Sequence, residues 1–234
     1  MDARLPGSSR SAAPVNQRHL AVTRTARLQL LGQPDERVRE VWFACHGYGQ
    51  LASEFVRHLE PVATPERLVV APEALSRFYK DALEAGADTR RVGATWMTRE
   101  DREAEIADYV AYLDAACASI LAELSPGVRT HALGFSQGVA TVVRWLCLGG
   151  ARVDALTLWA GGLPHDLALE EFASRFSRTE VTLVAGDRDP LVSEDAVAAA
   201  SDRLRTAGIP HEVVRFAGGH RLDRAVLHRL AGER

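Results

Sequence analysis

The sequence predicts an α/β fold, in which a mostly parallel sheet carries helices on both faces. Five short apolar runs end in turn residues, as strands buried on both faces of a parallel sheet do. These runs are residues 41–47, 67–73, 130–136, 153–161 and 180–186. Helical stretches lie between them, and strands that alternate with helices are typical of a doubly wound sheet. We therefore expect one domain over residues 16–234, preceded by a disordered tail of residues 1–15.

The two ends of the predicted domain also carry strand patterns. Residues 19–31 alternate polar and apolar side chains, which predicts an edge strand or one arm of a hairpin. Residues 211–217 form the last predicted strand, and a terminal helix containing His228 follows them.

Two helices are marked by their ends and faces. The first begins with a capping-box-like pattern at Thr98 and Asp101 and has one apolar face over residues 106–124. The second begins at Ser193 as N-cap and ends at Gly208, because glycine tolerates the positive φ of a helix end.

Composition excludes several classes of protein. The chain has 234 residues, of which 47% are hydrophobic and 25% charged, as in a globular protein with a substantial core. Its 28 basic and 31 acidic residues are interspersed, so no basic stripe points to nucleic acid as a partner. No apolar run reaches the roughly 18 residues of a membrane span.

Cysteine usage indicates a reducing compartment. Cys45, Cys117 and Cys147 lie far apart in apolar segments and form neither a C-x-x-C pair nor an even-numbered disulfide framework. The first residues lack the apolar stretch of a secretory signal. A cytoplasmic location is therefore expected.

A glycine-flanked serine carries the main chemical signal. Gly134-Phe135-Ser136-Gln137-Gly138 lies where a predicted strand passes into a predicted helix. A nucleophile elbow needs this context, because a sharp strand-to-helix turn exposes the serine hydroxyl and the flanking glycines permit close packing. The alternative is a serine that merely turns the chain.

A nucleophilic serine needs a base and an acid that orients the base, and both candidates follow it in the chain. Asp189 and His220 each lie in a loop directly after a predicted strand, where sites gather in open α/β sheets. Asp187 competes with Asp189, although its position favours hydrogen bonds to its own turn. His165 competes with His220, since it also follows a strand.

The oxyanion of an acyl-transfer intermediate needs backbone N–H donors. The Gln137 amide is one candidate, because it lies at the expected N-terminus of a helix. The second donor is expected from the glycine-containing loop of residues 45–49, after the first apolar run.

Four motifs together resemble a known family. HGYG, GFSQG, GDRDPLV and GGH are similar, in order and approximate spacing, to motifs of the phospholipase/carboxylesterase family, which includes the acyl-protein thioesterases. The resemblance covers about residues 20–232. It implies an α/β-hydrolase fold without a large cap domain, no cofactor, no metal, and a small-molecule ester or thioester substrate. The implied site consists of Ser136 as nucleophile, His220 as base, Asp189 as acid, and the Tyr48 and Gln137 amides as oxyanion hole.

The sequence departs from this family's pattern on the substrate side. Val139 stands where the thioesterase-like members usually have another glycine, and Trp96-Met97-Thr98 replaces their Trp-Phe-Asp segment. We expect Trp96, Met97 and Leu191 to line the substrate pocket, and residues 74–98 to form a pocket wall, a partial lid or packed core. A carboxylesterase is the first expectation; a thioesterase or lysophospholipase is the second.

Three other classes of function can be compared with a serine hydrolase on the sequence. A metal hydrolase is disfavoured because no H-E-x-x-H or clustered His/Asp set occurs. A catalytically inactive ligand-binding homologue of the same fold is disfavoured because every triad and oxyanion position is filled. An acyltransferase would share all these residues. The sequence fixes neither the oligomeric state nor the acyl chain.

Overall fold

The computed structural model describes residues 15–81 and 90–232. The predicted tail therefore lies outside the described residues except for Val15. Part of the predicted pocket wall or lid, residues 82–89, lies outside them as well. None of the helices in the described segments has the length and apolar character needed to cross a bilayer.

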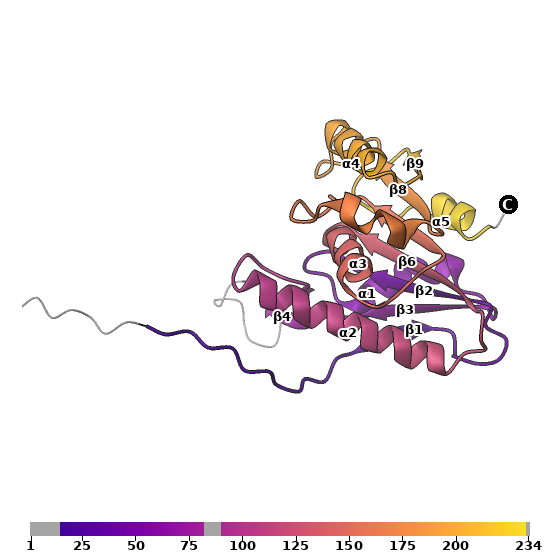
Figure 1. Cartoon of the computed structure of the whole chain (residues 1–234). Helices are drawn as coiled ribbons and strands as arrows, with labels where there is room; N and C mark the ends of the chain where they lie inside the picture. Colours follow the sequence, from indigo (N-terminus) through magenta and orange to yellow (C-terminus); the bar gives the residue numbers. More distant parts are fainter. Residues whose placement is uncertain (1–14, 82–89, 233–234) are drawn as a thin grey trace, which may run out of the picture.

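A seven-stranded sheet forms the centre of the fold, in the order β1-β3-β2-β6-β7-β8-β9 (Figure 1). Only β1 runs antiparallel to its neighbour. The strands are β1 Leu28–Leu31, β2 Glu40–Cys45, β3 Arg67–Pro72, β6 Arg129–Phe135, β7 Ala155–Trp159, β8 Glu180–Gly186 and β9 His211–Phe216. The predicted mostly parallel sheet is thus confirmed, and its strands coincide with the apolar runs because β-branched and aliphatic side chains suit strands covered on both faces.

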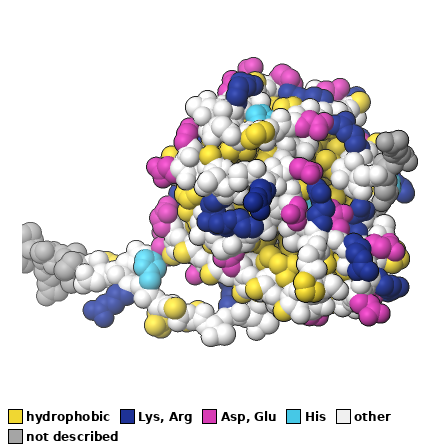
Figure 2. Space-filling model, turned by 45° about the vertical axis from the view of Figure 1, so that its right-hand side comes forward, with side chains coloured by type: hydrophobic (Ala, Val, Ile, Leu, Met, Phe, Trp, Pro, Cys, Tyr) yellow, Lys and Arg dark blue, Asp and Glu magenta, His cyan; other side chains and the backbone are white. Residues whose placement is uncertain are grey.

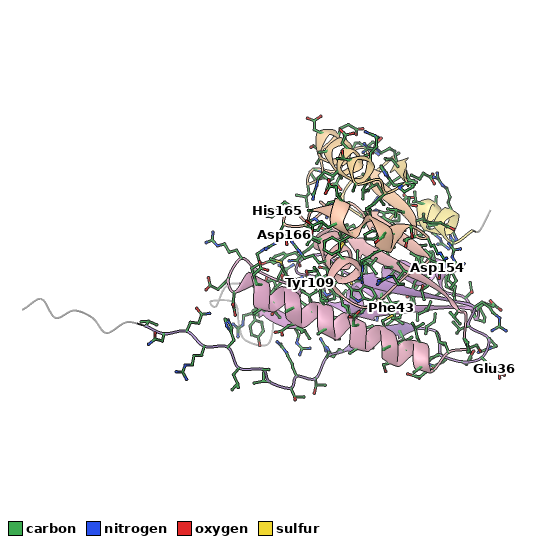
Figure 3. All side chains as sticks on the ribbon, in the orientation of Figure 1. Glu36, Phe43, Tyr109, Asp154, His165 and Asp166 are labelled. Carbon is green, nitrogen blue, oxygen red and sulfur yellow. The ribbon has the colours of Figure 1, made fainter. Side chains whose placement is uncertain are left out.

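Helices cover both faces of this sheet, as the sequence predicts. One face carries α2 Arg102–Ala122, α3 Gln137–Leu148, α4 Glu194–Thr206 and the 3-10 helix η3 Leu169–Phe176. The other carries α1 Ala52–Phe55, the 3-10 helix η1 Val56–Val62 and α5 Arg224–Leu230. Phe43 of β2 and Tyr109 of α2 belong to the core between α2 and the sheet (Figure 3). Within the described residues no separate domain caps the sheet.

The strand register brings distant loops together. Cys45 at the end of β2 pairs with Gly134 near the end of β6. Gly186 at the end of β8 pairs with Phe216 at the end of β9. Carboxyl ends of parallel strands meet at one edge of a sheet, so the loops after these four strands share that edge.

Both predicted helix starts can be compared with the observed caps. Ser193 caps α4, because its side chain accepts a hydrogen bond from the Ala196 amide, and Gly208 has the expected positive φ of 71°. The prediction of a capping box at Thr98 and Asp101 is wrong. Asp101 has a left-handed φ of 49° and makes no side-chain cap.

Two other local predictions need correction. The edge strand expected over residues 19–31 is only β1, because no neighbouring strand pairs with residues 15–27. The region 74–98 contains an unpredicted antiparallel pair, β4 Ser76–Tyr79 and β5 Val92–Thr95. Short strands of mixed composition carry too little periodicity to be found from sequence.

The cysteines and surface charges agree with the sequence analysis. Cys45, Cys117 and Cys147 are buried and unpaired, and burial raises the pKa of the Cys117 thiol to about 11. Basic and acidic side chains are interspersed over the face drawn in Figure 2.

Candidate active site

Ser136 lies at a strained turn between β6 and α3. Its φ of 55° and ψ of −117° are unusual for a residue with a Cβ, and such strain is stored where surrounding structure enforces it. The Ser136 amide donates to Trp159 O at 2.9 Å. A Cβ on Gly134 would lie 2.4 Å from Gly138 O, so the turn requires glycine there. The predicted elbow geometry is therefore present.

His220 and Asp189 form a hydrogen-bonded pair beside this turn. His220 Nδ1 lies 2.8 Å from Asp189 Oδ2, and the Asp189 side chain is fully shielded from solvent. The other oxygen, Asp189 Oδ1, accepts from the amides of Leu191 (2.8 Å) and Val192 (3.1 Å). The carboxylate is thus fixed from both sides and can orient the imidazole.

The His220 imidazole lies close to the turn at Ser136 but is not hydrogen-bonded to the serine. The His220 ring lies 4.9 Å, centroid to centroid, from the ring of Phe135, the residue before Ser136. Among the described residues, Ser136 Oγ makes no hydrogen bond to His220. Contacts between a nucleophile and its base often tighten only when substrate is bound.

The competing aspartate has a structural role. Asp187 Oδ1 accepts from the Gly218 amide at 2.9 Å, and this bond is the main cause that lowers the pKa of Asp187. It joins the loops after β8 and β9. Asp187 therefore positions the segment that carries His220 without contacting the imidazole.

The competing histidines lie elsewhere. His165 is exposed on the loop after β7 next to Asp166 (Figure 3), whose carboxylate is bonded by Arg144. His131 is buried in β6, with Nε2 2.8 Å from Thr157 Oγ1. The remaining histidines occupy the arm before β1, the loop after β2, η1, β9 and α5; they are His19, His46, His58, His211 and His228.

In the loop after β2, the backbone amides on either side of Tyr48 are hydrogen-bonded. The Gly47 amide donates to Gln50 Oε1 at 2.8 Å and the Gly49 amide to Ala94 O at 2.8 Å. Within the described part of the chain, the Tyr48 amide has no acceptor. The Gln137 amide also has none, because the first N–H groups of a helix lack intrahelical partners.

These two free amides belong to segments that touch. A Cβ on Gly47 would lie 3.1 Å from Ser136 Cβ. A Cβ on Gly138 would lie only 2.1 Å from Cys45 O. The loop after β2 and the start of α3 therefore pack against each other around Ser136.

The three predicted pocket residues differ in environment. Trp96 is 3% exposed and packs under the loop after β2. Met97 is half-buried, and its backbone oxygen accepts from the Gln137 side chain at 3.0 Å. Leu191 is 72% exposed next to Asp189. For Trp96 the packed-core alternative named for residues 74–98 therefore describes its environment.

A separate groove lies away from these residues. A groove of about 490 Å³ runs between α2 and the end of α3, lined among others by Val110, Asp114 and Leu148. It contains none of Ser136, His220 and Asp189, so we do not assign the chemistry to it.

Comparison with known proteins supports the fold. No protein-family model and no curated protein matches the chain. Among solved structures, acyl-protein thioesterase 2 from Zea mays has a TM-score of 0.66 and 17% identity over 89% of this chain and 97% of its own. A phospholipase/carboxylesterase from Dyadobacter fermentans has a TM-score of 0.61 and 17% identity over 91% and 97%. The Bacillus cereus carboxylesterase has 0.60 and 16% over 88% and 92%.

The chain therefore has the α/β-hydrolase fold. The similar structures named above are esterases and a thioesterase. In each case the alignment with this chain covers nearly the whole length of the other protein.

Proposed function

We propose that the chain is a serine hydrolase of the phospholipase/carboxylesterase family that cleaves carboxylic esters. The single observation that carries the proposal is the hydrogen-bonded Asp189-His220 pair at the edge of the sheet where Ser136 lies in a strained turn. A carboxylate that holds an imidazole beside a half-buried serine in a strained turn is the arrangement of a hydrolytic triad. The similarity to esterase structures supports it.

In the proposed reaction Ser136 Oγ attacks the acyl carbonyl while His220 Nε2 takes its proton. Asp189 holds the imidazole by its Nδ1–H and stabilises the imidazolium. The carbonyl oxygen becomes an oxyanion that accepts from the Tyr48 and Gln137 amides. His220 then gives the proton to the leaving alcohol, and the acyl group stays on Ser136.

Water completes the cycle. His220 takes a proton from a water molecule as this attacks the acyl-enzyme, a second tetrahedral oxyanion forms, and its collapse releases the acid and returns the proton to Ser136 Oγ. This chemistry needs no cofactor. A cytoplasmic location stays a prediction that rests on the sequence.

Labelling with a fluorophosphonate tests the proposal. The reagent phosphonylates an activated serine, so we expect a single adduct on Ser136, found by peptide mass spectrometry, and none on the Ser136→Ala protein. A matched control is Ser193→Ala, which removes the exposed cap of α4 and should leave labelling intact. An unlabelled wild-type protein would favour the inactive ligand-binding alternative.

Thioester hydrolysis is the second candidate, because the same machinery serves both bonds and one similar structure is an acyl-protein thioesterase. A panel of p-nitrophenyl esters, acyl-CoA thioesters and lysophospholipids ranks the substrate classes by kcat/KM. Product analysis with an added alcohol separates hydrolysis from acyl transfer.

A further inference from the structure

The two proposed oxyanion donors belong to different segments of the chain. The Tyr48 amide lies in the loop after β2, whereas the Gln137 amide opens α3. Oxyanion stabilisation depends on donors held about 2.7–3.1 Å from the developing charge. A group that fixes the spacing between these two segments therefore affects turnover without touching the substrate.

Trp96 bonds to both segments at once. Its indole Nε1–H donates to His46 O at 2.9 Å, two residues before Tyr48. Its backbone N–H donates to the side-chain oxygen of Gln137 at 3.2 Å. The residue that presents one donor amide is thus tied, through one buried tryptophan, to the loop that presents the other.

The Gln137 side chain completes one end of this bridge. Its Nε2 donates to Thr95 Oγ1 at 2.9 Å and to Met97 O at 3.0 Å. With the bond from the Trp96 amide, the last residue of β5 and the two residues after it are held by one amide side chain. An apolar side chain of similar length would release them while leaving the Gln137 backbone N–H in place.

His46 holds the other end. The imidazole ring is fully buried and lies 5.1 Å from the Trp96 ring. Its Nδ1 donates to Gly47 O at 2.8 Å, and its Nε2 accepts from the Ala74 amide at 3.1 Å. Burial lowers the pKa of His46, which favours the neutral ring that these two bonds require.

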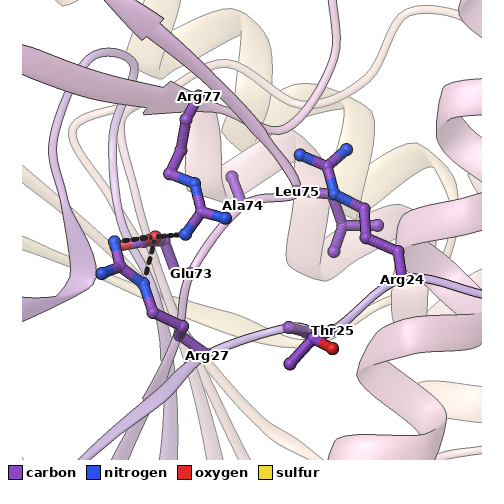
Figure 4. Close-up of a pocket in the computed structure, with 8 residues that line it drawn as sticks. Arg24, Thr25, Arg27, Glu73, Ala74, Leu75 and Arg77 are labelled. Atoms are coloured by element: carbon purple, nitrogen blue, oxygen red, sulfur yellow. Dashed lines mark hydrogen bonds and ion pairs between the residues drawn. The ribbon is translucent and has the colours of Figure 1, made fainter.

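The segment that binds His46 is itself anchored. Glu73, which precedes Ala74, is 2% exposed and binds Arg27 at 2.5 Å and Arg77 at 3.0 Å (Figure 4). Its second oxygen accepts from the Ala52 amide at 3.3 Å. The His46 ring therefore rests on a fixed support, and Trp96 joins that support to α3.

We infer that Trp96 is a positioning residue that sets the distance between the Tyr48 and Gln137 amides, rather than a wall of the substrate pocket. The inference rests on the proposed function. Replacing the indole by a phenyl ring keeps most of the buried packing but leaves His46 O without its donor. The loop after β2 is then free to shift, and the oxyanion is less well stabilised.

Trp96→Phe tests this role. Loss of a whole oxyanion donor costs about 10²–10³ in kcat, so a displaced donor should lower kcat by about 10–100-fold. KM should change by less than about threefold, because the bond lost acts mainly in the transition state. A trifluoromethyl ketone, which Ser136 converts to a hemiketal oxyanion, should lose affinity by the same factor as kcat/KM.

Trp145→Phe is the matched control. The Trp145 indole is also buried and also donates one hydrogen bond, to Asp114 Oδ1 at 2.8 Å, but it lies near the far end of α3. This variant should be destabilised similarly and keep wild-type kcat. Equal kcat in Trp96→Phe and wild type, or equal losses in both variants, would overturn the inference.

A second variant keeps the test decisive if Trp96→Phe does not fold. Gln137→Met removes the acceptor of the Trp96 amide but retains the Gln137 backbone donor, so it should also lower kcat and inhibitor affinity with little effect on KM. Unchanged kinetics in Gln137→Met would overturn the inference in that case. Failure of the proposed function is distinguishable, because the wild-type protein itself would then take no fluorophosphonate label.

Discussion

Asp189 Oδ2 lies 2.8 Å from His220 Nδ1, with the carboxylate side chain shielded from solvent. Asp187, two residues earlier, instead accepts from the Gly218 amide. The two carboxylates thus differ in their contacts within one loop. Asp189 holds the imidazole, and Asp187 joins the loops after β8 and β9.

Asp189→Asn should therefore lower kcat far more than Asp187→Asn. An amide at position 189 would favour the wrong histidine tautomer, which costs up to about 10⁴ in kcat. Asp187→Asn should act mainly on stability. Steady-state kinetics, measured at equal folded fraction, compares kcat of the two variants. A larger kcat loss in Asp187→Asn would assign Asp187, and not Asp189, as the acid that orients His220.

Ser136→Ala and His220→Ala should each remove most turnover and leave the fold intact. Because members of a triad act as a unit, the double variant should lose little more than either single one. Circular dichroism checks the fold and ester hydrolysis measures the rates. Losses that add in free energy would indicate that the two residues act independently.

Gly138→Ala should impair both stability and activity. The new Cβ would lie 2.1 Å from Cys45 O, so α3 and the loop after β2 must move apart. Overpacking of this kind typically costs about 1–3 kcal/mol. Gly162→Ala is the control, since a Cβ there meets nothing within 4 Å. Urea unfolding and kcat measure both, and equal behaviour of the two variants would contradict the predicted clash.

Stability should fall in mild acid because burial lowers the pKa of two histidines, first His46 and second His131. Burial lowers the pKa of the His131 imidazole to about 3, with Arg129 and Arg67 adding to the effect, whereas an unfolded histidine titrates near 6.5. Below about pH 6.5 the unfolded chain therefore binds a proton that the folded chain does not. The stabilisation from His131 is complete above that pH and is lost toward the folded pKa, by about 1.4 kcal/mol per pH unit.

His131→Gln should reduce this pH dependence. The comparison is the change in unfolding free energy from about pH 7.5 to about pH 5, measured by urea denaturation, because the substitution also changes absolute stability. His58→Gln, on the exposed side of η1, should leave the wild-type slope unchanged. An equal slope in His131→Gln and wild type would show that another group causes the acid sensitivity.

The parallel strands of the central sheet and the elbow at Ser136 could be predicted from sequence, because both have local causes. Strands covered on two faces need continuous apolar runs, and a strained turn needs glycines on either side. The same reasoning placed candidate acids and bases after β8 and β9. These patterns need no knowledge of what packs against them.

The tertiary structure decided which groups meet. Asp189 bonds to His220, whereas Asp187, two residues earlier in the same loop, bonds to the Gly218 amide. The Gly47 and Gly49 amides find acceptors in Gln50 and Ala94, whereas the Tyr48 amide between them finds none among the described residues. Hydrogen-bond partners remote in sequence depend on strand register and packing, and neither leaves a periodic pattern in the sequence.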